Sequence, residues 1–249
     1  MLGVGVVLSL GVSGMVRMGE NKEICKHATD CARDAAENLH VTVLRSMEVL
    51  YSIAALHAAH GEINRVDFHD FVQSALARQP ELQALSWNPV IHPADRAEAE
   101  GRARWEGLSN YQIRETAPQG GFLPAGLRPE YVPVYYIEPL SNNVAALGFD
   151  LESDPARGAS LARACAQAEP MATAPIRLAQ GPDNQTGFLV VLPVYHGSTL
   201  PAPAERHHQL AGYAVAVFRV ANLVTGSFDR LTKQGLEAGL YDPSPESPL

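Results

Sequence analysis

The sequence lacks the short motifs that mark the common enzyme classes. It has no G-x-S-x-G nucleophile elbow, no G-x-x-x-x-G-K-S/T phosphate loop, no G-x-G-x-x-G dinucleotide fingerprint and no C-x-x-C pair. The carboxylates Asp229, Glu237 and Asp242 are scattered and do not suggest an acid–base pair. We therefore expect neither catalysis nor a cofactor from this chain.

Clusters of Lys and Arg are also missing. The formal net charge is −8 over 249 residues. An acidic chain without a basic patch has no electrostatic footprint for nucleic acid, and anionic lipid surfaces repel it. Nucleic acid is therefore not expected as a partner.

Cysteine is scarce, and its spacing does not favour an intramolecular disulfide. Cys25 and Cys31 lie six residues apart on an expected helix, which exceeds the Cα separation of a disulfide, and Cys165 is distant in sequence. We expect three unpaired thiols, with an intermolecular bridge between neighbouring helices as the alternative. His57 and His60 have an i, i+3 spacing, but a strong metal site needs three or four convergent ligands, so no metal is expected.

The N-terminal segment 1–16 carries no charge and is mostly apolar. It is slightly short for a membrane span of about 20 residues, and it lacks the basic front region of a signal peptide. Its Gly and Val content makes it a poor soluble helix. We interpret it as the outer part of a transmembrane helix, with a buried helix of a soluble protein as the alternative.

A long helical pattern follows over residues 17–61. Apolar residues recur at spacings of three and four without a proline, and Gly61 is expected to end the helix. Beyond it, helices are expected over 67–78, 93–108, 156–168 and 221–231, strands over 82–91, 111–116, 131–137, 172–178, 187–195, 209–220 and 235–241, a loop over 120–129, and a disordered Pro/Ser-rich tail. This order of elements predicts an α+β fold whose sheet could hold a small-molecule cavity.

Five blocks of sequence resemble the CHASE domain family. They read YVPVYYIEP, NNVAALGFDLESDPARGASLARA, MATAPIRLAQ, QTGFLVVLPVYHG and LAGYAVAVFRVANLV, and their order and spacing carry the resemblance over roughly residues 68–231. The resemblance implies an extracytoplasmic sensor between two transmembrane helices, with a long N-terminal stalk helix and PAS-like antiparallel sheet subdomains flanked by helices. Such sensors control histidine kinases, diguanylate cyclases and phosphodiesterases, or adenylate cyclases.

The resemblance also implies a domain organisation. Segment 1–16 would be a transmembrane remnant, 17–61 the stalk, 62–220 the membrane-distal ligand-binding region, and 221–249 the start of an incomplete membrane-proximal subdomain. We expect a bacterial inner-membrane receptor that faces the periplasm, forms a homodimer through the stalk and binds a small molecule. The output module would lie outside this chain. The alternative is a dimerisation or protein-interaction module without a small-molecule ligand.

The resemblance implies a ligand pocket in the distal subdomain. Its expected residues are Tyr135, Ile137, Asn143, Leu147, Phe149, Asp154, Thr173, Arg177, Ala179, Val191 and Pro193. Plant cytokinin receptors of the family read adenine with an aspartate and a threonine. Ala156 and Val191 stand at those places here, with Asp154 as a possible substitute for the aspartate. Since an unpaired polar edge costs about 1–3 kcal/mol per group, an adenine-type ligand is one possibility among small, flat or apolar molecules.

Overall fold

The computed structural model describes residues 2–61, 63–178, 186–197 and 199–223, and it gives the side chains of all of these except 2–25, 27 and 28. The chain divides into two compact units, one of Met1–Thr42 with Val224–Leu249 and one of Val43–Leu223. In the first unit, residues 2–42 are helical. The expected strand 235–241, the tail and all but the start of the expected helix 221–231 lie outside the described residues.

Helix α1 (Leu2–His60) runs through both segments that were expected to be helical. Its predicted end is confirmed. Gly61 adopts a φ of +71°, and its N–H donates to the His57 carbonyl at 2.8 Å. Glycine suits this position because a left-handed residue closes the last turn without a Cβ clash.

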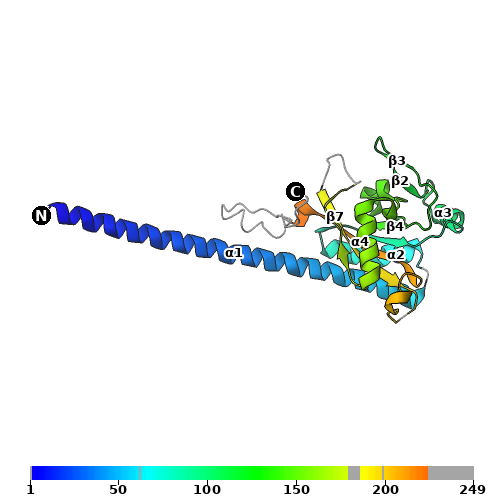
Figure 1. The fold of residues 1–249 in the computed structure, drawn as a ribbon, viewed down its shortest axis with the longest axis horizontal. Coiled ribbons are helices and arrows are strands. Elements are labelled where there is room, and N and C mark those ends of the chain that lie inside the picture. Colours follow the sequence, from blue (N-terminus) through cyan, green and yellow to red (C-terminus); the bar gives the residue numbers. More distant parts are fainter. Residues whose placement is uncertain (1, 62, 179–185, 198, 224–249) are drawn as a thin grey trace. The chain divides into compact units, whose positions relative to one another are not determined.

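The second unit is built around an antiparallel sheet (Figure 1). Its strand order is β4-β1-β8-β7-β5, and β6 also pairs with β7. The long strands carry apolar side chains on both of their faces, as expected for a sheet that is covered on both sides. The strands are β1 (Leu82–Pro89), β4 (Tyr136–Glu138), β5 (Met171–Ala172), β6 (Ile176–Arg177), β7 (Thr186–Tyr195) and β8 (Leu210–Arg219).

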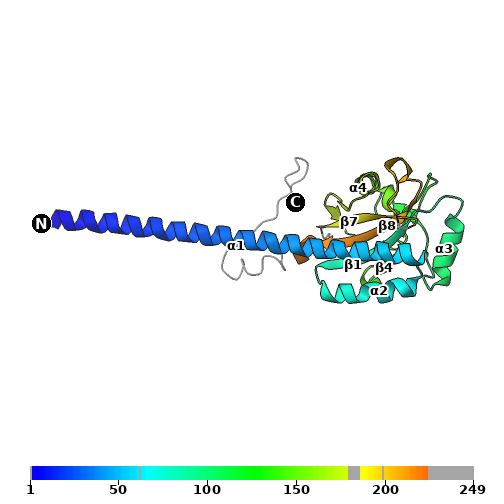
Figure 2. The same cartoon turned by 90° about the horizontal axis from the view of Figure 1, so that it is seen from below.

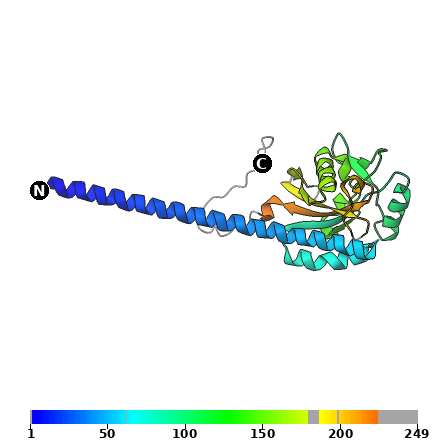
Figure 3. The ribbon, with the colours of Figure 1, turned by 60° about the horizontal axis from the view of Figure 1, so that its bottom comes forward.

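Helices cover the two faces of this sheet differently. The last turns of α1 and the helix α2 (Arg65–Arg78) lie side by side on one face, and α4 (Pro155–Gln167) lies on the other (Figures 2 and 3). We call these the α1 face and the α4 face. A buried hydrogen bond of 2.9 Å from the Ser46 hydroxyl to Gln79 Oε1 joins α1 to the end of α2.

The register of the long strands decides which side chains share the α4 face. Ser86 of β1 pairs with Val215 of β8, which pairs with Val191 of β7. The next row toward the β7–β8 turn contains Asn88 and Tyr213. Two polar residues of β1 therefore stand among the apolar side chains of the α4 face.

Short elements complete the second unit. Helix α3 (Arg96–Trp105) agrees with the expected charged helix, and β2 (Arg114–Thr116) forms a separate two-stranded sheet with β3 (Phe122–Pro124). The expectation of a loop throughout 120–129 was therefore wrong. Gly120 and Gly121 both have positive φ, and the Ala117 N–H donates to the Gly121 carbonyl, so these glycines form the turn of a small hairpin.

Two expected strands are shorter than the sequence pattern suggests. Pro133 has no N–H to donate, and residues 131–135 pair only through isolated bridges before β4 begins at Tyr136. In the same way Pro175 stands between β5 and β6, which divides the expected strand 172–178. The fold class itself is confirmed: a long N-terminal helix precedes a PAS-like antiparallel sheet with flanking helices.

Candidate ligand-binding site

A small cavity lies on the α4 face of the sheet, and we call it the inner cavity. Its volume is about 40 Å³. Strands β1, β6, β7 and β8 supply one wall, and the chain from Val134 through β4 to the first turn of α4 supplies the other. The lining residues are Ser86, Val134, Ile137, Ala146, Phe149, Leu151, Arg157, Ile176, Leu178, Leu189, Val215 and Val217.

Two residues of β1 bring polar groups to this face. Ser86 is 2% exposed, and its hydroxyl donates to Asn88 Oδ1 at 2.7 Å. Asn88 is fully buried, and its Nδ2 meets no acceptor among the described residues. A buried amide donor without a partner costs roughly 1–3 kcal/mol, so a group that accepted this hydrogen bond would stabilise the domain.

Arg157 brings a positive charge to the opposite wall. The guanidinium carbon lies 5.0 Å from the centroid of the Phe149 ring, and Nη1 donates to Asp154 Oδ2 at 2.7 Å. Burial lowers the pKa of Arg157 from its ordinary value, and Asp154 partly offsets that effect. The side chain therefore offers donors at the edge of an otherwise apolar cavity.

The structure brings some of the expected pocket residues together. Ile137 and Phe149 line the inner cavity, while Leu147 and Val191 pack in the apolar cluster around it. Pro193 lies on the same face of β7, next to Tyr213. The ligand-binding roles of these residues stay predictions.

Other expected pocket residues have structural partners elsewhere. Thr173 is buried, and its Oγ1 accepts a hydrogen bond from the Leu189 N–H at 3.0 Å. Asn143 is fully buried, and its Nδ2 donates to the Pro139 carbonyl at 2.7 Å. Asp154 caps α4, since its Oδ1 accepts from the Arg157 N–H at 3.0 Å.

Three further expected residues lie away from the cavity. Arg177 is exposed on β6, and Ala179 lies outside the described residues. Tyr135 lies toward α3, where its hydroxyl donates to the Ala99 carbonyl at 2.9 Å. Conversely, the sequence analysis did not name Ser86 and Arg157 as pocket residues. Arg157 could have been found, because it follows Ala156, the residue that was compared with the adenine-reading aspartate.

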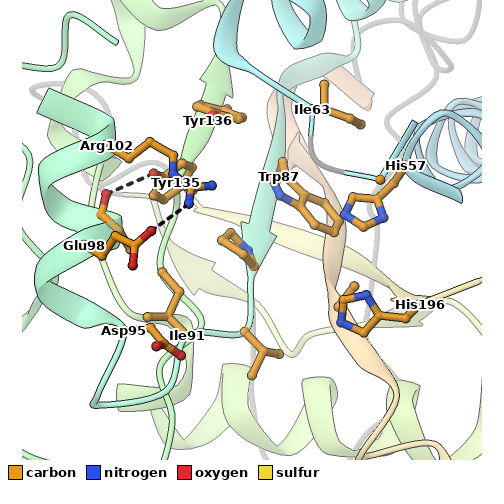
Figure 4. Close-up of a pocket in the computed structure, with 15 residues that line it drawn as sticks. His57, Ile63, Trp87, Ile91, Asp95, Glu98, Arg102, Tyr135, Tyr136 and His196 are labelled. Atoms are coloured by element: carbon orange, nitrogen blue, oxygen red, sulfur yellow. Dashed lines mark hydrogen bonds and ion pairs between the residues drawn. The ribbon is translucent and has the colours of Figure 1, made fainter. Parts of the chain in front are cut away.

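A second and larger hollow, the outer pocket, lies within the same unit and has a volume of about 500 Å³. Figure 4 shows Trp87, His57 and His196 on one side of it and Asp95, Glu98 and Arg102 of α3 on the other. The His57 and Trp87 ring centroids are 4.5 Å apart. This pocket has more room than the inner cavity and a mixed aromatic and charged lining.

The second unit is thus a PAS-like antiparallel sheet with flanking helices and a small cavity on its α4 face. Residues 61–249 match the CHASE domain family, so the chain belongs to that family, whose members are extracytoplasmic sensor domains. The recognition made from the five sequence blocks is confirmed.

Two known proteins are similar to the chain. Hybrid signal transduction histidine kinase A of Dictyostelium discoideum is 24% identical over 254 residues, which cover 96% of this chain and 12% of that protein. The ligand-binding domain of the Pseudomonas aeruginosa PAO1 amino acid chemoreceptor PctC, solved with GABA, is 14% identical with a TM-score of 0.43, covering 80% of this chain and 65% of that one.

Within the described part of the chain, His, Cys, Asp and Glu side chains form no group of three or more that could hold a metal ion. The segment Thr29–His60 of α1 is long and apolar enough to cross a membrane by length and composition. The core helix of a soluble protein can be equally long and apolar. Leu50 and Ile53 of this segment are fully buried in the second unit.

Proposed function

We propose that the chain is the periplasmic sensing domain of an inner-membrane receptor and that it binds a small molecule in the inner cavity. The observation that carries this proposal is a set of polar groups at an apolar cavity. Ser86 and Arg157 line opposite walls, and the amide of Asn88, two residues along β1 from Ser86, has no acceptor among the described residues. Family membership supports the sensor role, and the similarity to a hybrid histidine kinase supports a kinase as output.

The chemistry of these groups indicates the class of ligand. The Arg157 guanidinium is a donor that lines the cavity, and Asn88 Nδ2 is a donor two residues along β1 from Ser86. The lining residues other than Ser86 and Arg157 are aliphatic or aromatic. A mostly apolar molecule with one or two hydrogen-bond acceptors complements this set. Adenine-type compounds carry such ring-nitrogen acceptors and are one member of the class.

The cavity must enlarge before it can hold such a ligand. About 40 Å³ holds only a few atoms, whereas benzene enters an apolar cavity of about 150 Å³. Entry of the ligand would therefore displace side chains between the sheet and α4. Binding shifts the receptor between two states only if the ligand has different affinities for them.

The proposal is tested with a blocked cavity and a matched control. Ala146 lines the inner cavity and is buried, while its neighbour Ala145 is exposed. We expect calorimetric titration with adenine derivatives and other small acceptor-bearing molecules to detect binding to the wild type and to A145L, and at least tenfold weaker binding to A146L. The inner-cavity proposal would be overturned if none of these compounds binds, or if A146L binds them as tightly as the wild type does.

The small volume of the inner cavity favours a second candidate function. Phe149 and its neighbours fill most of the space, as expected of a packed interaction module without a small-molecule ligand. In that case the domain would act through a homodimer along the stalk or through a protein partner. If the domain is such a module, folded A146L should leave the signalling output of the full-length receptor unchanged. The small-molecule proposal instead predicts that A146L abolishes the change in output that the ligand causes.

A further inference from the structure

The outer pocket is separate from the cavity assigned to the proposed ligand. It opens beside the α1 face, between the end of α1, strand β1 and helix α3 (Figure 4). Its volume of about 500 Å³ falls within the range of roughly 300–1,000 Å³ that is usual for small-molecule sites. The described residues leave this volume open, so among them no side chain has to move before a ligand enters.

Aromatic rings form one wall of the outer pocket. Tyr135 and Tyr136 stand with their ring centroids 4.8 Å apart, and Trp87 lies beside them on β1. Both tyrosine hydroxyls are already engaged, since Tyr135 donates to the Ala99 carbonyl and Tyr136 donates to Glu106 at 2.7 Å. The wall therefore presents π-faces and ring edges to an incoming molecule rather than free hydroxyls.

Glu98 of α3 and Asp95, which precedes this helix, bring acidic side chains to the same pocket. Glu98 is paired with Arg102 at 3.2 Å, so these two charges offset each other. Asp95 makes no side-chain cap at the start of α3, and its carboxylate has no ion-pair partner among the described residues. Asp95 thus brings to the pocket one negative charge without a described counter-ion, and the net charge of −8 adds a field of the same sign.

We propose that the outer pocket is a second ligand site that takes a small organic ammonium ion with an apolar body. The ammonium group would lie against Asp95, and the body would stack on Trp87 and the tyrosine rings. Aromatic faces attract cations through their quadrupole, and a nearby carboxylate adds direct charge attraction. Because His57 of α1 and Gly61, which follows this helix, line the same pocket, this ligand contacts the end of α1 directly.

The sequence provides a built-in reporter for this site. Its two tryptophans are Trp87, in the wall of the pocket, and Trp105, which is 88% exposed. The variant W105F leaves Trp87 as the single emitter. We expect 2-phenylethylammonium to change its fluorescence with a saturable dependence on concentration, and 3-phenylpropionate, of similar size and opposite charge, to leave it unchanged.

A charge variant and its control locate the site. In the W105F background, D95N should weaken binding of the amine about tenfold, the usual size of one charge-assisted contact. D70N removes the same charge from an exposed position on α2 and should leave binding unchanged. The proposal is wrong if 3-phenylpropionate binds as tightly as the amine, or if D95N and D70N have the same affinity for the amine. It is also wrong if the fluorescence change does not saturate with amine concentration.

The blocked inner cavity separates this proposal from the proposed function. W105F/A146L should bind the amine like W105F, because Ala146 lines only the inner cavity. Loss of amine binding in this double variant would place the amine in the inner cavity and overturn the second site. Failure of the inner-cavity ligand screen, in contrast, has no bearing on amine binding to W105F.

Discussion

Asp154 holds Arg157 in two ways: its Oδ1 accepts the Arg157 backbone N–H at 3.0 Å, and its Oδ2 accepts the Arg157 guanidinium at 2.7 Å. The same carboxylate thus begins helix α4 and fixes Arg157, the one cation among the described residues that line the inner cavity. We expect D154A to lower the free energy of unfolding by about 1–2 kcal/mol, because both the cap and the counter-ion are lost.

The variant D154N separates these two contributions. Asparagine caps a helix as well as aspartate does, so D154N should lose only the ion pair and unfold at an intermediate urea concentration. Urea denaturation of the wild type and both variants measures this. An unfolding midpoint of D154A equal to that of the wild type would contradict the double role.

Substitution of Gly148 would show how rigid the segment before α4 is. Its φ is +75°, and a Cβ there would meet the Gln112 carbonyl oxygen at 2.0 Å. Gly197 has a similar φ of +83° but open space around a Cβ. We expect G197A to cost about 1 kcal/mol from the left-handed backbone alone, and G148A to cost at least about 2 kcal/mol more from the added clash. Similar thermal unfolding temperatures for the two variants would show that this segment shifts freely.

Asp150 gives the domain a pH dependence of a definite sign. The residue is fully buried, and burial raises its pKa above the ordinary value of 3.8, although Oδ1 accepts the Val132 N–H at 2.8 Å and Arg128 lies 3.5 Å from Oδ2. A raised pKa means that the folded state binds the proton more tightly than the unfolded state. Stability from this residue is therefore present below pH 3.8 and is lost as the pH rises through the raised pKa.

The variant D150N cannot titrate at this position and should not show that loss. We expect the free energy of unfolding of D150N to improve relative to the wild type as the pH rises through this window. Urea denaturation at a series of pH values measures the difference between the two proteins, in which the other carboxylates cancel. The opposite trend would mean that Arg128 outweighs the burial of the carboxylate.

Arg96 and Arg102 lie on the same helix but should differ in importance. Arg96 donates to the carbonyls of Ala125 at 2.7 Å and Ile113 at 3.0 Å, and it stands over the Tyr131 ring. We expect R96A to destabilise the domain by about 2–3 kcal/mol, because two acceptors lose a charged donor. R102A loses an exposed ion pair and should stay within about 0.5 kcal/mol of the wild type. Equal effects in chemical denaturation would refute this difference.

The helices and the β7–β8 hairpin could be predicted from the sequence because local rules decide them. Gly61 ends α1 as a left-handed residue, and Asp154 followed by a proline begins α4. The strands β7 and β8 are long enough for turn signals and β-branched residues to define them. These features depend on neighbours in the chain, which a sequence displays.

The cavity lining could be predicted only in part, because it depends on strand faces. Strict alternation would place Tyr135 and Ile137 on the same face, yet Ile137 lines the inner cavity and Tyr135 lines the outer pocket. Residues 131–135 do not form a regular strand, so period two fails just before β4. Ser86 lies in the largely apolar strand 82–89, where no pattern tells which face it joins.

The hydrogen bond between Ser46 and Gln79 limits the kinds of motion by which this domain could pass on a signal. A slide of α1 past α2 by one helical turn, about 5.4 Å, would separate the two side chains and leave both buried without each other. A joint tilt or rotation of α1 and α2 keeps the bond intact. The bond therefore opposes movement of α1 relative to α2 and leaves unopposed any movement that the two helices make together.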